Sequence, residues 1–223
     1  MGYSFSFKIV ISPFTGSDTT ATQLAANFFY LTNNPSVLTR LTKEIRSTFG
    51  SLDEIVLGPK LDTCKYLHAV VNETIRISPS VPGILPREVM EGGITVQGEF
   101  FPPGTELAVP IYTVHHHPDV YPDPHKYRPE RWLTEENSEE ELRLRQDTLN
   151  PFSYGSRQCL GKRLAFIELY LTVARAVWNY ELDYLGAGKE DRLKDDALEY
   201  KLIDHMASYR EGPIIQFTPR FSN

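Results

Sequence analysis

One cysteine lies in the stretch PFSYGSRQCLGKRLAFIELYLTVARAVW, residues 151–178, in a setting that could support chemistry. Gly155 allows backbone angles that other residues avoid, so the segment before Cys159 can fold as a tight loop that carries the thiol to the start of a helix. The positive end of the helix dipole and the exposed backbone N–H groups there favour a thiolate. A thiolate is a soft, strongly donating ligand for iron.

The chemistry open to this thiolate is limited because the only other cysteine is Cys64. No C-x-x-C pair exists, so a four-cysteine zinc or iron–sulfur site is excluded. A single axial thiolate beneath a haem needs one cysteine and an otherwise apolar pocket. The alternative is a buried structural cysteine, which is the commoner outcome for a lone cysteine.

Two shorter motifs carry polar groups at helical spacing. In ETIR, Glu73 and Arg76 are three residues apart, and alone they predict a surface ion pair worth roughly 0.3 kcal/mol. In TGSDTT, residues 15–20, Asp18 alone predicts the N-cap of a helix. Gly16 would loosen that helix, and the Thr19 hydroxyl can bond to a carbonyl one turn back.

Apolar periodicity and proline or glycine boundaries predict the helices that position these motifs. We expect helices over residues 18–33, 35–50 and 62–77, the first starting after Pro13, which is tolerated only near a helix start. A fourth helix, predicted over 160–178, should have one face fully buried. That face repeats apolar residues at three and four: Leu160, Leu164, Ile167, Leu171, Ala174 and Trp178.

Between and after these helices the sequence changes character. Residues 78–133 hold most of the prolines and several short apolar runs, which predicts small sheets and loops. Residues 134–147 are acidic and are predicted to form a surface insertion or short helix without chemistry. The C-terminal run GPIIQFTPR predicts strand. The fold class is therefore mainly α with a small β region.

Composition excludes several functions. The formal net charge is −6 and the basic residues form no dense run, so we expect no nucleic-acid partner. No window approaches the roughly 18 apolar residues of a membrane span, so none is expected in this chain. Three consecutive histidines, residues 115–117, raise the alternative of a metal site, but adjacent side chains point in different directions and rarely converge on one ion.

The segment FSYGSRQCLG resembles the haem-binding signature F-x-x-G-x-R-x-C-x-G of the cytochrome P-450 superfamily at every fixed position. The resemblance implies that Cys159 is the proximal iron ligand of haem b. It also implies that Phe152 and Gly161 shape the loop around the sulfur and that Arg157 meets a haem propionate. Three more family motifs occur in the family's order within residues 15–165.

ETIR and PERW, residues 129–132, resemble the family's E-x-x-R and P-E-R-F segments, the second with Trp in the last place. The resemblance implies a triad of Glu73, Arg76 and Arg131, whose planar guanidiniums would lock the loop before the cysteine against the third helix. Arg87 occupies the place of an arginine that pairs with a propionate. His116, or its neighbour His115, is also expected near a propionate.

TGSDTT is similar to the family's oxygen-activating segment (A/G)-G-x-(D/E)-T-(T/S), and Thr15 departs from the usual small first residue. The resemblance implies catalytic roles for Asp18, which would relay protons from outside, and for Thr19, whose hydroxyl would bond to iron-bound oxygen. With the haem motifs in order, this interpretation displaces the simple helix cap.

The resemblance covers residues 15–223 as a partial haem-binding oxygenase domain, the C-terminal half of the cytochrome P-450 fold. Residues 1–14 fit the family poorly and are taken as an atypical N-terminal segment. We expect the membrane anchor and the helices over the haem's other edge to be missing, as in a truncated product or partial gene model. The long helices would then expose apolar surface.

The predicted function is that of a haem-thiolate monooxygenase. It would insert one atom of O₂ into a small apolar organic substrate, with electrons from NADPH through a reductase that docks near Lys162 and Arg163. The sequence looks most like the fungal secondary-metabolism branch, and the family resemblance implies the cytoplasmic face of the endoplasmic reticulum membrane. The alternative is a truncated, non-catalytic remnant that acts as a binding or interaction protein or has no activity.

Overall fold

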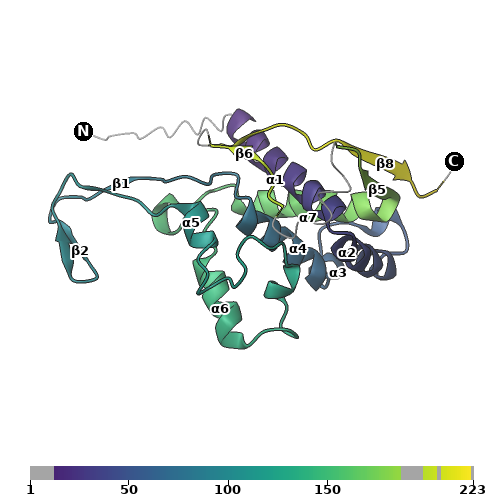
Figure 1. The fold of residues 1–223 in the computed structure, drawn as a ribbon, viewed down its shortest axis with the longest axis horizontal. Coiled ribbons are helices and arrows are strands. Elements are labelled where there is room, and N and C mark those ends of the chain that lie inside the picture. Colours follow the sequence, from purple (N-terminus) through teal and green to yellow (C-terminus); the bar gives the residue numbers. More distant parts are fainter. Residues whose placement is uncertain (1–12, 187–197, 205–206, 222–223) are drawn as a thin grey trace, which may run out of the picture.

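The computed structural model describes residues 13–186, 198–204 and 207–221, in which four long helices pack around a main hydrophobic core (Figure 1). A smaller cluster of Val71, Ile75 and Leu169 lies between α4 and α7. The core draws on every one of these helices, since Phe29, Leu41, Leu67 and Val177 are each at most 4% exposed. Helix α1 contacts both α4 and α7. The long helices are α1 (Pro13–Asn33), α2 (Pro35–Thr48), α4 (Lys65–Ile77) and α7 (Lys162–Asn179).

The first three predicted helices are present: α1 and α4 start at other residues than predicted, and α2 starts at Pro35 as predicted but ends two residues earlier. Helix α1 begins at Pro13, so Asp18 lies inside the helix and the N-cap alternative is wrong. A proline at the first position fits because its missing N–H would be unpaired there in any helix. The predicted atypical segment 1–14 falls outside the described residues except for its last two, which begin α1.

The predicted burial of the helix after the cysteine is wrong for its first turns. Helix α7 starts at Lys162, so Leu160 precedes it and is 91% exposed, and Leu164 is 59% exposed. The buried face is set by Leu169, Val173 and Val177, which follow one another at four-residue spacing. The helix was thus predicted two residues too early, and other parts of the described structure bury only its later turns.

The strands form small two-stranded antiparallel sheets, as predicted. Strands β2 and β3 make a hairpin that projects away from the helices, whereas β5 and β8 lie close to the end of α7 (Figure 1). The pairs are β1 (Arg87–Glu88) with β4 (Glu106–Leu107), β2 (Ile94–Val96) with β3 (Glu99–Phe101), β5 (Tyr180–Tyr184) with β8 (Ile215–Pro219), and β6 (Leu202–Ile203) with β7 (Tyr209–Arg210).

Shorter helices connect these parts. The acidic segment forms α6 (Glu139–Thr148), which begins with a reciprocal capping box between Ser138 and Glu141. Its buried side chains are Leu142 and Arg145. No helix in the described ranges is long and apolar enough to cross a membrane. The remaining short elements are α3 (Pro59–Asp62), α5 (Ile111–His115) and the 3₁₀ turns η1 (Leu52–Glu54), η2 (Pro129–Trp132) and η3 (Gly155–Arg157).

Candidate functional site

The loop before α7 presents the thiol of Cys159 at the surface. Gly155 has φ +69°, which a glycine adopts without strain, and Ser153 has φ +59°. The Cys159 N–H closes the loop by donating to the Phe152 carbonyl at 2.9 Å. Cys159 is exposed, so the alternative of a buried structural cysteine does not describe it. It does describe Cys64, which is fully buried and whose thiol pKa burial raises to about 11.

A cavity of about 190 Å³ joins this loop to α1 and α4. Cys159, Phe152 and Arg157 line it from the loop, and Thr19 lines it from α1. The structure therefore brings four of the predicted site residues to one space that lies between elements far apart in the sequence. Most of the other lining side chains are apolar, among them Ile75, Val81, Leu85, Pro151, Ala165 and Leu169.

A second cavity of about 500 Å³ adjoins the first, because Leu85 and Ser153 line both. Arg87 borders this second space, and its Nη1 donates to the carbonyls of Leu85, at 3.1 Å, and Pro86, at 2.9 Å. Arg87 and Arg157 thus line two adjoining cavities. Both are exposed and able to meet an anionic group.

The α1 wall of the first cavity is tied to the segment after α4. The Ser80 hydroxyl lies 2.8 Å from the Thr19 carbonyl and 3.0 Å from Gln23 Oε1. Gln23 Nε2 donates to the Ser78 carbonyl at 3.1 Å. The Thr19 hydroxyl is 3.5 Å from the Gly16 carbonyl. Asp18, one residue earlier, is exposed to solvent. Ser80 and Gln23 were not predicted from the sequence, since their partners are more than 50 residues away.

Glu73, Arg76 and Arg131 meet in the interior, all three at most 1% exposed. Arg76 binds the Glu73 carboxylate with two donors, at 2.9 and 2.8 Å, and Arg131 Nε lies 3.3 Å from the same group. The surface ion-pair alternative is therefore wrong. Burial opposes ionisation of Glu73, but the charges of Arg76 and Arg131 and the hydrogen bonds from Arg76 and the Arg128 N–H together lower the carboxyl pKa.

Other residues complete this buried network. Trp132 Nε1 and the Arg128 N–H also donate to Glu73, at 2.9 and 3.0 Å. From α6, Arg145 donates to the Arg131 carbonyl at 3.0 Å, so the acidic segment supports the triad from outside. Sequence reasoning missed Arg145, because α6 carries two arginines, at 143 and 145, and no local pattern shows that Arg145 is the buried one.

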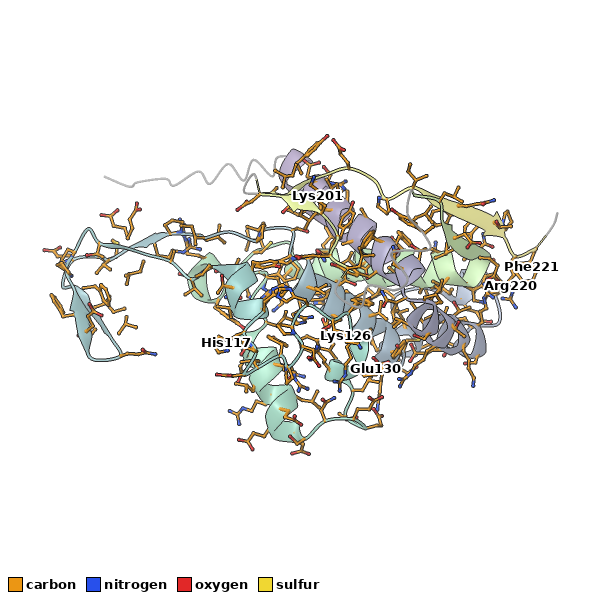
Figure 2. The ribbon with its side chains drawn as sticks, viewed as in Figure 1. His117, Lys126, Glu130, Lys201, Arg220 and Phe221 are labelled. Carbon is orange, nitrogen blue, oxygen red and sulfur yellow. The ribbon has the colours of Figure 1, made fainter. Side chains whose placement is uncertain are left out.

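The three consecutive histidines diverge. His115 Nε2 contacts Asn150, whereas His116 Nδ1 lies 2.8 Å from the Tyr112 carbonyl. His117 is exposed at the surface near α5 (Figure 2). Burial lowers the pKa of His115 to about 3 and that of His116 to about 4. His116 lines neither cavity, so its contact with a propionate stays a prediction. The described residues contain no group of three His, Cys, Asp or Glu side chains able to hold a metal ion.

The chain belongs to the cytochrome P450 family, whose model matches residues 9–202. It is 45% identical over 208 residues to cytochrome P450 monooxygenase atnE of Emericella nidulans, covering 92% of this chain and 39% of the relative. Cytochrome P450 monooxygenase poxM of Penicillium oxalicum is 42% identical, with 91% and 37% covered. Cytochrome P450 monooxygenase lcsN of Purpureocillium lilacinum is 40% identical, with 92% of this chain and 62% of the relative covered. The predicted family and a partial form of its fold are confirmed, and the chain spans about two fifths of the first two relatives.

Proposed function

We propose that this chain carries the haem-binding part of a haem-thiolate monooxygenase that inserts one oxygen atom from O₂ into a small apolar organic substrate. The observation that carries the proposal is the shared cavity: a lone exposed cysteine and a helix threonine line one largely apolar space. Oxidoreductase chemistry of this class is what the family and its fungal relatives support.

The residues around the cavity fit a haem. One sulfur donor, apolar walls and two nearby guanidiniums are the donor set that a flat apolar macrocycle with an acidic edge requires. Cys159 would hold the iron, and Arg157 and Arg87 would pair with the propionates. A Cβ at Gly161 would already touch Cys159 Sγ at 3.7 Å, so a larger side chain there would compete for the space at the sulfur. Bound haem would supply the activation of O₂.

The α1 residues would handle protons. Asp18 is exposed to solvent, and Thr19, the next residue of α1, lines the cavity. Asp18 would relay protons from water, and the Thr19 hydroxyl would deliver them within the cavity. The buried triad would contribute by holding the cysteine loop in place rather than by touching substrate.

We propose NADPH as the electron source, delivered by a reductase. Lys162 and Arg163 border a groove of about 910 Å³ that also reaches Cys159, and their charge would steer an acidic docking surface toward the thiol side of the site. The relatives are fungal monooxygenases, which supports a role in secondary metabolism. The family supports attachment at the cytoplasmic face of the endoplasmic reticulum. A binding role without catalysis is the second candidate, favoured by the exposed side chains of Leu160 and Leu164.

One spectrum tests the proposal. The chain, expressed with a haem supply, reduced and exposed to carbon monoxide, should show the red-shifted Soret band of a thiolate-ligated ferrous complex. Cys159→Ala should abolish the band, and the matched control Cys64→Ala should keep it, because Cys64 is buried away from the cavity. A spectrum of unligated or histidine-ligated haem in the unmodified chain would favour the binding role.

A further inference from the structure

We infer that His115 is the positioning residue for the cysteine loop and acts through Asn150. The consequence for haem rests on the proposed function, but the mechanical link does not. Imidazole Nε2 lies 3.1 Å from Asn150 Oδ1, and the Asn150 N–H lies 3.1 Å from the same nitrogen. Two polar groups of one residue therefore converge on a single atom of His115. Asn150 directly precedes Pro151, where the loop that ends at Cys159 begins.

The other side of His115 is anchored in the buried triad. Its carbonyl accepts a hydrogen bond from Arg76 Nη1 at 3.0 Å, and Arg76 holds Glu73 with its remaining nitrogens. His115 is 0% exposed, so both its backbone and its ring are fixed by packing. One residue thus connects α4, through its arginine, to the first residue of the loop.

The His115–Asn150 contact is connected to Cys159 through Pro151 and Phe152. Phe152 follows Asn150 by two positions, and its carbonyl accepts the Cys159 N–H at 2.9 Å. Pro151 has a fixed φ, so a displacement of Asn150 is passed on to Phe152 with little slack. Loss of the His115 contact should therefore loosen the hydrogen bond that closes the loop at Cys159.

The contact with the Asn150 N–H requires an unprotonated Nε2, which accepts that hydrogen bond. A protonated Nε2 would instead donate to Asn150 Oδ1, so the two contacts belong to different protonation states of the ring. Burial, together with the nearby positive charge of Arg76, keeps the imidazole neutral. Nδ1 is buried and has no hydrogen-bond partner among the described residues. The His115 ring therefore makes its hydrogen bonds through Nε2 alone.

That single-atom contact defines a discriminating pair of substitutions. A glutamine side chain extends to the position of Nε2, whereas an asparagine side chain reaches only as far as Nδ1. His115→Gln should therefore keep the link to Asn150, and His115→Asn should break it. His116 offers the matched control, because it is the next residue and is also buried, yet its Nδ1 bonds within α5 to Tyr112 and not to the loop.

Amide hydrogen exchange measured on the haem-free chain tests the link. In His115→Asn the amides of residues 150–159 should exchange roughly tenfold faster than in the unmodified chain, as expected when one buried hydrogen bond is lost. His115→Gln and His116→Asn should exchange at the unmodified rate. Asn150→Ala removes the Oδ1 contact and keeps the N–H contact, so it should speed exchange by a smaller factor, and it serves if His115→Asn does not fold. Equal rates in the two asparagine variants, or no rescue by glutamine, would overturn the inference.

A second readout concerns the haem. In the reduced carbon monoxide complex, His115→Asn should lose red-shifted Soret intensity relative to the unmodified chain at equal haem content, and His115→Gln should retain it. If the unmodified chain gives no such band, the proposed function fails while the exchange rates still decide the link. If the band is present and His115→Asn keeps all of it, the inference fails while the proposed function stands.

Discussion

The indole Nε1 of Trp132 donates to Glu73 Oε2 at 2.9 Å. Arg76 Nε reaches the same oxygen at 2.9 Å, and the opposite oxygen accepts three further donors from Arg76, Arg128 and Arg131. Trp132 stands where the family's P-E-R-F segment has a phenylalanine, which has no N–H to donate. The departure from the motif therefore strengthens the buried carboxylate site.

Trp132→Phe should lower the free energy of unfolding by about 1.5 kcal/mol, the value for a hydrogen bond to a charged group. Urea unfolding measures the loss. The control is Trp178→Phe at the chain's other tryptophan. Trp178 Nε1 donates to the neutral carbonyl of Phe49 at 3.1 Å, so this variant loses a hydrogen bond to a neutral group instead of a charged one.

The pH dependence separates the two tryptophan variants. The folded-state pKa of Glu73 is lowered from its ordinary 4.5, so the stability it confers is present above that value and is lost as the pH falls through the folded pKa. Removing the Trp132 donor should raise the folded-state pKa of Glu73. The stability lost on acidification should then be smaller, and the loss should occur at higher pH. Trp178→Phe should leave its position unchanged, and identical acid profiles for the two variants would contradict the assignment.

Glu73→Gln should cost about 3–5 kcal/mol, because it leaves the guanidiniums of Arg76 and Arg131 buried without a counter-charge. The variant Glu135→Gln is the control, because Glu135 lies 3.5 Å from Lys65 Nζ and the two side chains are 62% and 68% exposed. That change should cost far less than Glu73→Gln in the same urea unfolding experiment. Similar costs at both positions would show that the triad contributes no more than a surface pair.

Two glycine substitutions should have opposite signs. Gly155 has φ +69° and open space where a Cβ would lie, so Gly155→Ala should destabilise by about 1 kcal/mol through the backbone alone. Gly16 lies within α1 and also has open space, so Gly16→Ala should stabilise by up to about 1 kcal/mol through helix propensity. Thermal unfolding of both variants checks the pair. Stabilisation by Gly155→Ala would mean that the loop does not need the left-handed conformation.

Ser80→Ala should lower the free energy of unfolding by about 1 kcal/mol, because the Thr19 carbonyl and Gln23 Oε1 share its single hydroxyl donor. Ser47→Ala is the control, since that hydroxyl donates to the Glu44 carbonyl on an exposed helix surface and should change stability by less than about 0.5 kcal/mol. Urea unfolding distinguishes them, and an equal, negligible effect would deny Ser80 its role in fixing α1.

The helices could be predicted from the sequence because proline, glycine and apolar spacing are local signals. Asp18 was expected at a helix start because aspartate is a common N-cap, but α1 begins at Pro13, which is also a helix-start signal. Leu160 and Leu164 were expected to be buried because periodicity identifies an apolar face but not whether anything covers it. The cysteine loop and the triad followed from motif resemblance. His115 with Asn150, and Trp132 with Glu73, join residues 35 and 59 positions apart, a relation that no local pattern encodes.

Helix α6 is held to the rest of the protein chiefly by Leu142 and Arg145, while its remaining side chains face water or lie near the surface. Its outward positions can therefore accept a cysteine for a fluorescent dye, or a short epitope, with little effect on the interior. A probe at Leu144, which is 48% exposed, would report on tumbling and crowding at a fixed distance from the thiol-bearing loop. Helix α6, the most acidic part of the sequence, is therefore a suitable labelling site for following the molecule inside a cell.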